Sequence, residues 1–193
     1  MLFKHFCHVY KPKECLRDAD REPAQITDIL LHVAVLSLIP TICVYFATVH
    51  IGWDLGVDSL FTMTPEKAII AALAGFAFLN IGVYALGYAI CWFAKTFDLN
   101  PKPLHCTELA VFSSLPLFLL GFVALYPVLY INVLVGLFAM AAAVYLLYTG
   151  IPIFMHIPEE EGFVYSTWVI TIGLVMLVVF LGAAIFFISA TSA

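Results

Sequence analysis

Five polar residues near the starts of two apolar stretches have side chains that could bind a metal ion or carry a proton. Asp28 and His32 are four residues apart, so they share one face if their stretch is helical. His105, Cys106 and Glu108 lie at the start of a later stretch and offer nitrogen, sulfur and carboxylate ligands. If the two stretches are neighbours, these side chains could form one site. The alternative, which we favour, is an interfacial ion pair and ordinary polar residues at helix starts.

A second group of potential metal ligands lies near the beginning of the chain. Its members are imidazole and thiol side chains, namely His5, Cys7, His8 and Cys15. Such ligands suit zinc or copper, but their spacing does not match that of structural zinc sites. We therefore expect an irregular, solvated segment here, with metal binding as the alternative. No cofactor is predicted.

A polar stripe runs along the second apolar stretch. Its members recur at helical spacing and are Asn80, Tyr84, Gly87 and Cys91, with Tyr88 to one side. Its expected partners are hydroxyl and amide side chains of the next two stretches, namely Ser113, Ser114, Asn132, Tyr145, Tyr148 and Thr149. These groups could line a polar path. We favour the alternative that they form interhelical hydrogen bonds, in which case Asn80 must find a partner.

No motif for catalysis accompanies these residues. The chain has neither an HExxH motif nor a pair of mid-membrane aspartates, so neither a metalloprotease nor an intramembrane protease is indicated. No Asp, Glu, Lys or Arg lies in the middle of an apolar stretch, which argues against a pump with a central carboxylate. We expect a protein that is not an enzyme.

The elements that position the polar residues are membrane-spanning helices. Of 193 residues, 64% are hydrophobic and 11% charged, whereas soluble domains are about half apolar and about a quarter charged. Five apolar runs exceed or approach the length of about 20 helical residues that crosses a bilayer core. They cover residues 25–48, 66–94, 107–126, 128–150 and 163–189. The sequence predicts an all-α transmembrane bundle over residues 25–193, after a cytoplasmic segment, residues 1–24, that could hold a short interfacial helix.

Prolines punctuate the predicted helices. Pro40 and Pro116 lie inside the first and third helices, where a missing N–H favours a kink. Pro127 separates the third helix from the fourth, and Pro152 predicts the end of the fourth. The fifth helix is the least polar, so we expect it to be the most exposed to lipid.

Basic residues give the bundle a predicted orientation. Five Lys or Arg residues precede the first helix, and Lys95 and Lys102 lie between the second and third, whereas only Lys67 lies on the opposite side. The positive-inside rule therefore predicts a cytoplasmic N-terminus and an outside C-terminus. Cys91 and Cys106 then face the reducing compartment, and the five scattered cysteines predict no disulfide framework. The net charge of −5 argues against nucleic acid as a partner.

Short motifs reveal a resemblance to a known family. They are Leu38-Ile39-Pro40, Ser113-Ser114-Leu115-Pro116, Ala124-Leu125-Tyr126-Pro127 and, most specifically, Tyr145-Leu146-Leu147-Tyr148-Thr149-Gly150-Ile151-Pro152. From Ile26 onward the chain resembles bacterial members of the Yip1 family, whereas the first 20 residues match poorly. The resemblance implies a five-helix protein of the bacterial inner membrane with a periplasmic C-terminus. Eukaryotic members act in vesicle trafficking and bind Rab-type small GTPases, a partner that is not carried over to a bacterial chain.

Two functions stay open at this point. The first is a membrane organiser or adaptor, whose partners would be the lipid bilayer, a cytoplasmic protein or further copies of itself. The second is a transporter or channel for a small solute or ion. Five helices are few for a secondary transporter, and no inverted repeat is visible, so transport would require an oligomer.

Overall fold

The computed structural model describes residues 16–17, 25–54, 56, 60–97, 99 and 101–192, without the side chains of residues 97, 159, 180, 181 and 183–192. Within this part of the chain, five helices are long and apolar enough to cross a membrane, which confirms the predicted all-α transmembrane bundle. Most of the N-terminal segment, including His5, Cys7, His8 and Cys15, lies outside the described residues.

Short irregular helical turns extend three of the five spans. The elements are α2 (Ile26–Phe46), the π-helical turn η2 (Ala47–Ile51), α3 (Pro65–Ala94), the 3₁₀ turn η3 (Lys95–Phe97), α4 (Pro103–Leu119), the 3₁₀ turn η4 (Leu120–Leu125), α5 (Leu129–Met155) and α6 (Glu159–Ser192). Pro65 and Pro103 each open a helix, because proline lacks only an N–H that the first turn leaves unbonded. Pro127 separates η4 from α5, as predicted.

The end of α5 differs from the prediction. Pro152 lies inside the helix, which continues to Met155 and ends at His156 in a left-handed conformation with φ 55°. Prolines are tolerated in membrane helices because neighbouring groups accommodate them. Here Gly162 of α6 makes room for the ring, since a Cβ atom at Gly162 would lie 2.6 Å from Pro152 Cγ. The prediction that Pro152 breaks the helix is therefore wrong.

The starts of α4 and α6 also differ from the prediction. Each lies four residues earlier than expected, at Pro103 and at Glu159. The glutamates Glu160 and Glu161 consequently stand in the first turn of α6, where the positive end of the helix dipole favours acidic side chains.

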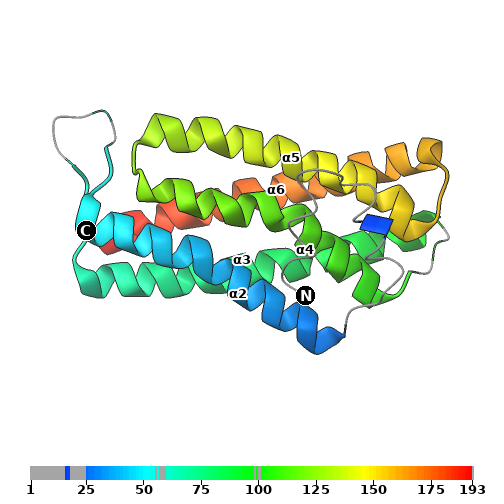
Figure 1. Ribbon diagram of the computed structural model, residues 1–193, viewed down its shortest axis with the longest axis horizontal. Coiled ribbons are helices and arrows are strands. Elements are labelled where there is room, and N and C mark those ends of the chain that lie inside the picture. Colours follow the sequence, from blue (N-terminus) through cyan, green and yellow to red (C-terminus); the bar gives the residue numbers. More distant parts are fainter. Residues whose placement is uncertain are drawn as a thin grey trace.

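Successive helices run in alternating directions (Figure 1). We call the end where α2, α4 and α6 begin the proximal end, and the other the distal end. The third of the five spanning helices, α4, is central: it packs against α2, α3 and α5, whereas α6 packs against α3 and α5. In the most apolar stretch of each helix, 61% of residues are buried for α4, 22% for α6 and 6% for α3. Over residues 160–179, where its side chains are described, the last helix is therefore not the most exposed, contrary to the prediction.

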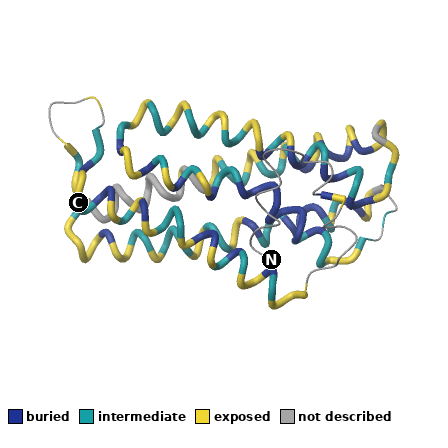
Figure 2. The backbone as a smooth tube through the Cα atoms, viewed as in Figure 1, coloured by how far each residue is buried: buried dark blue, intermediate teal, exposed yellow. Residues whose placement is uncertain are grey.

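The buried core lies mainly in the proximal half of the bundle (Figure 2). Leu109 of α4, Phe154 of α5 and Tyr165 of α6 are among its fully or almost fully buried members. Leu16, which belongs to the predicted cytoplasmic segment, is also completely buried in this core. This residue therefore contributes to the core of the bundle.

A close backbone approach joins α2 to η4. A Cβ atom at Gly121 would collide with the backbone of Pro40, including its nitrogen at 2.8 Å. Only glycine, which has no side chain, permits this approach. Pro40 of α2 therefore packs directly against the backbone of Gly121.

The distal end is closed by paired backbone segments. Trp53 and Phe61 exchange backbone hydrogen bonds of 2.8 and 3.0 Å. The N–H of Asp54 donates to the Pro127 carbonyl at 2.8 Å, and the Leu129 N–H donates to the Asp54 carbonyl at 3.0 Å. The α2–α3 connection is thereby tied to the break between η4 and α5.

Candidate functional site

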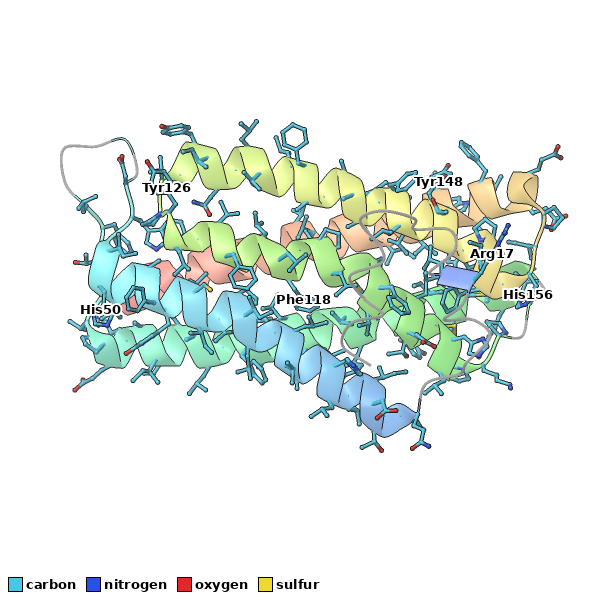
Figure 3. All side chains as sticks on the ribbon, viewed as in Figure 1. Arg17, His50, Phe118, Tyr126, Tyr148 and His156 are labelled. Atoms are coloured by element: carbon cyan, nitrogen blue, oxygen red, sulfur yellow. A yellow bond between two sulfur atoms is a disulfide. The ribbon has the colours of Figure 1, made fainter. Side chains whose placement is uncertain are left out.

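The five predicted rim residues lie at the proximal end, where Figure 3 also shows Arg17 and His156. His32 Nδ1 lies 2.5 Å from the backbone oxygen of Asp28, one turn earlier in α2. The His105 ring meets Phe154 of α5 edge-on, with centroids 6.2 Å apart. These contacts place the two histidines against different neighbours, one within α2 and one between α4 and α5.

Cys106 is joined to Cys91 by a disulfide, with Cα atoms 5.7 Å apart. The scattered cysteines, which predicted no disulfide framework, thus include one disulfide-bonded pair. The 15-residue separation gave no signal, because the two residues meet only when the chain reverses between α3 and α4. Glu108, two residues further along α4, is buried with 7% of its surface exposed.

The rim does not assemble into a metal centre. In the part of the chain that the structure describes, no group of three or more His, Cys, Asp and Glu side chains could hold a metal ion. One rim thiol is instead engaged in a disulfide. Metal binding by the N-terminal histidines and cysteines stays a prediction, because those residues lie outside the described ones.

Asn80 connects two helices near the middle of the membrane. Its Nδ2 donates to Ser37 Oγ of α2 at 2.9 Å and to the Phe76 carbonyl of its own helix at 2.8 Å. Ser37 in turn donates to the Ala34 carbonyl at 3.0 Å. The expected partners were on the third and fourth helices, whereas the partner found is on the first.

The remaining interior hydroxyls mostly bond to backbone carbonyls of their own helix. Ser113 and Ser114 both donate to the Ala110 carbonyl, at 3.0 and 2.8 Å. Thr149 donates to the Tyr145 carbonyl at 2.8 Å. These bonds satisfy the hydroxyl hydrogens locally, so the three side chains offer no free donor to a passing solute.

Asn132 and Tyr148 serve as connections at the two ends of α5. Asn132 Nδ2 donates to the Tyr126 and Val128 carbonyls at 2.9 and 3.0 Å, which stabilises the first turn. Tyr148 Oη lies 3.1 Å from Thr167 Oγ1 of α6. Figure 3 shows Tyr126 and Tyr148 at opposite ends of the bundle.

The tyrosines of the predicted polar stripe and of its expected partners do not gather in one place. Tyr84 is half-buried, whereas Tyr88 is 72% and Tyr145 53% exposed. Side chains this exposed face the surroundings of the bundle and cannot line an interior path. The members of the stripe therefore have different surroundings. Asn80 contacts α2, Cys91 contacts α4, and Tyr88 lies on the outer surface.

Two interior polar residues that join different helices were not predicted from the sequence. Ser37 is completely buried and accepts the Asn80 hydrogen bond. Tyr165 is also completely buried and donates to the Ile90 carbonyl, which joins α6 to the end of α3. The run Tyr165-Ser166-Thr167 in an otherwise apolar helix was a signal for the second contact. Ser37 gave no comparable signal.

Comparison with known proteins identifies the family of the chain. The profile of the Yip1 domain matches residues 8–180. The chain belongs to the Yip1 family. The match begins well before Ile26, so the expectation that the first 20 residues match poorly is only partly met.

Two relatives of this Yip1-family protein carry the same name. The inner membrane protein YohC of Escherichia coli strain K12 is 35% identical over 154 residues, which is 80% of this chain and 79% of the relative. YohC of E. coli O6:H1 strain CFT073 has the same identity and coverage. No solved structure matches the chain significantly. The family and the membrane location are thereby shown, and the relatives' name states no activity.

Proposed function

We propose that this Yip1-family protein is a non-catalytic membrane organiser or adaptor that presents its proximal end to a partner in the cytoplasm. The observation that carries the proposal is the use of the interior polar side chains. Asn80, Ser113 and Ser114 donate to groups of the bundle itself, as expected of side chains that hold helices together.

The proximal end has the properties of a rigid platform. There the starts of α4 and α6, the end of α5 and Leu16 meet in one buried core. Charged side chains, among them Arg17, Lys102 and Glu160, are exposed around it. A fixed arrangement of both charge signs is suited to the recognition of a protein surface.

The orientation belongs to this proposal. The Lys and Arg distribution favours a cytoplasmic proximal end and a periplasmic C-terminus. A relative described as an inner membrane protein supports the bacterial inner membrane as the location.

Site-specific photo-crosslinking in living cells tests the adaptor function. A photoreactive residue at Glu160, exposed at the proximal end, is compared with one at Glu66, exposed at the distal end. We expect Glu160 to give a discrete cross-linked species that Glu66 does not give. A product at twice the chain's mass would identify a second copy as the partner.

A flux assay tests the alternative, a transporter or channel. Purified protein in liposomes is compared with the Asn80→Leu variant, and we expect no protein-dependent flux of ions or small solutes from either. Flux that the variant abolishes would contradict the adaptor proposal and favour a transport path at Asn80.

A further inference from the structure

The Cys91–Cys106 disulfide joins the last turns of α3 to the first turn of α4. Cys106 is completely buried, whereas Cys91 is half-buried. The segment that connects the two cysteines carries two exposed lysines, Lys95 and Lys102. The bond therefore lies near the membrane surface, on the side that the positive-inside rule assigns to the cytoplasm.

A disulfide on that side is unusual. Cytoplasmic thiols are kept reduced, and the disulfides that do form there are generally transient and serve catalysis or redox sensing. The chain also holds Cys43, which is buried in α2 as a free thiol. The structure thus distinguishes a paired set of cysteines from an inert buried one.

We propose that Cys91 and Cys106 form a reversible thiol–disulfide site, opened by a dithiol reductant of the cytoplasm and closed by a low-molecular-weight disulfide. The proposal rests on the orientation given under the proposed function, and it is independent of the adaptor role.

Burial determines the order of the exchange. A thiolate of the reductant attacks Sγ of the more accessible Cys91, and Cys106 leaves as a thiolate that takes a proton from water. The second thiol of the reductant then attacks the mixed disulfide and releases Cys91. One protein disulfide and one dithiol become two protein thiols and one oxidised dithiol. In the closing direction, Cys91 attacks the small disulfide, and Cys106 displaces the second small thiol.

Neighbouring contacts limit what opening can change. A Cβ atom at Gly87 would lie 2.9 Å from the Thr107 Cα, so α3 and α4 touch closely beside the disulfide. The Tyr165 hydroxyl holds the Ile90 carbonyl, next to Cys91, from α6. These contacts remain when the disulfide opens. We therefore expect opening to loosen the α3–α4 connection without unfolding the bundle, so that trypsin cuts after the exposed Lys95 several-fold faster.

The redox state is measured on full-length protein in intact cells. Replacement of Cys7, Cys15 and Cys43 by serine leaves the pair as the only cysteines. Cells are quenched in acid, and free thiols are labelled with a maleimide polymer that shifts the gel band. We expect both cysteines to be labelled in unstressed cells, neither after brief exposure to diamide, and both again after recovery.

A labelling pattern that stays the same under all three conditions would overturn the proposal. Cysteines that are never labelled would indicate a permanent structural disulfide, and cysteines that are always labelled would indicate no disulfide. A topology reporter at the C-terminus is read separately, so that a wrong orientation is recognised as such. Photo-crosslinking at Glu160 tests the adaptor role separately. A negative crosslinking result would leave the thiol measurement unaffected.

Single-cysteine variants test the order of attack. With Cys106→Ser added, Cys91 should be captured by glutathione disulfide, and with Cys91→Ser added, Cys106 should react many-fold more slowly because it is buried. Gel filtration confirms that both variants are folded. Equal capture at the two positions would contradict the assignment of Cys91 as the attacked sulfur.

Discussion

At the scale of single residues, Asn80 illustrates how a polar group is accommodated within a bilayer. An amide that lacks hydrogen-bond partners in lipid is costly, and Asn80 meets this requirement through Ser37 and the Phe76 carbonyl. The residue that attracted attention as a possible transport site is therefore used as a connection between α2 and α3.

Replacement of Asn80 by leucine should lower stability only modestly. The variant loses one interhelical hydrogen bond, worth about 0.6 kcal/mol in membrane proteins, and Ser37 keeps its own acceptor at Ala34. Unfolding of the purified protein in mixed micelles measures the difference. The Ser37→Ala variant and the double variant complete a double-mutant cycle, which gives the coupling free energy between the two side chains. A coupling free energy near zero would show that the bond contributes nothing.

Replacement of Gly121 by alanine should be clearly destabilising. The new methyl group would meet backbone atoms of Pro40, which cannot move as a side chain can, and overpacking of this kind costs about 1–3 kcal/mol. Thermal unfolding in detergent measures the loss. Gly82→Ala is the matched control, because a Cβ atom there meets nothing within 4 Å. Similar effects of both changes would contradict a special contact at Gly121.

At the scale of elements, the N-terminal segment is tied to the bundle through Leu16. Its side chain is completely buried in the core, while the adjacent Arg17 is exposed. Of the described part of this segment, one side chain therefore faces the core and the other faces outward.

Truncation of Leu16 should therefore weaken the whole bundle. The Leu16→Ala change removes a buried side chain and leaves a cavity, with a typical loss of about 2–5 kcal/mol. Arg17→Ala serves as the control and should have little effect. Denaturation of the two purified variants provides the measurement. If the two changes act equally, Leu16 is not part of the core in the membrane.

The helices also show why proline positions alone do not give helix ends. Pro127 does separate two elements, whereas Pro152 lies within α5. The difference is in the surroundings. Pro152 packs against Gly162 of α6, and this contact joins residues of two different helices, which no local pattern reveals.

At the scale of the whole molecule, the bundle is asymmetric. Its buried core lies mainly in the proximal half (Figure 2), and its distal end is closed by backbone pairing around Asp54. Charge follows the same asymmetry, since seven of the eight basic residues precede α2 or lie between α3 and α4. A protein with such different ends is expected to have one orientation in the membrane.

Reporter fusions test this orientation directly. Alkaline phosphatase fused after Ala193 should be active, because the enzyme requires the periplasm, whereas a fluorescent protein fused before Met1 should fluoresce in the cytoplasm. Exchange of Lys95 and Lys102 for glutamine removes two basic residues and should lower the phosphatase activity partially. An inactive C-terminal phosphatase fusion would reverse the assignment.

The sequence by itself determined the class of the protein. Long apolar runs in a chain with 11% charged residues can be stable only as helices in lipid, because their backbone groups must bond within the segment. Proline positions also predicted the start of α3 at Pro65 and the break between η4 and α5 at Pro127, to within a residue or two. The family was recognised from short motifs that include Tyr145–Pro152, and the match to the Yip1 domain confirms it.

Only the tertiary structure decided which residues meet. Asn80 bonds to Ser37, 43 residues away, Tyr165 bonds to Ile90, 75 residues away, and Cys91 pairs with Cys106 across a chain reversal. Helical periodicity specifies the face on which a side chain lies but not the helix that covers that face. The arrangement of the helices around α4 decides which helix covers each face, because α4 packs against α2, α3 and α5.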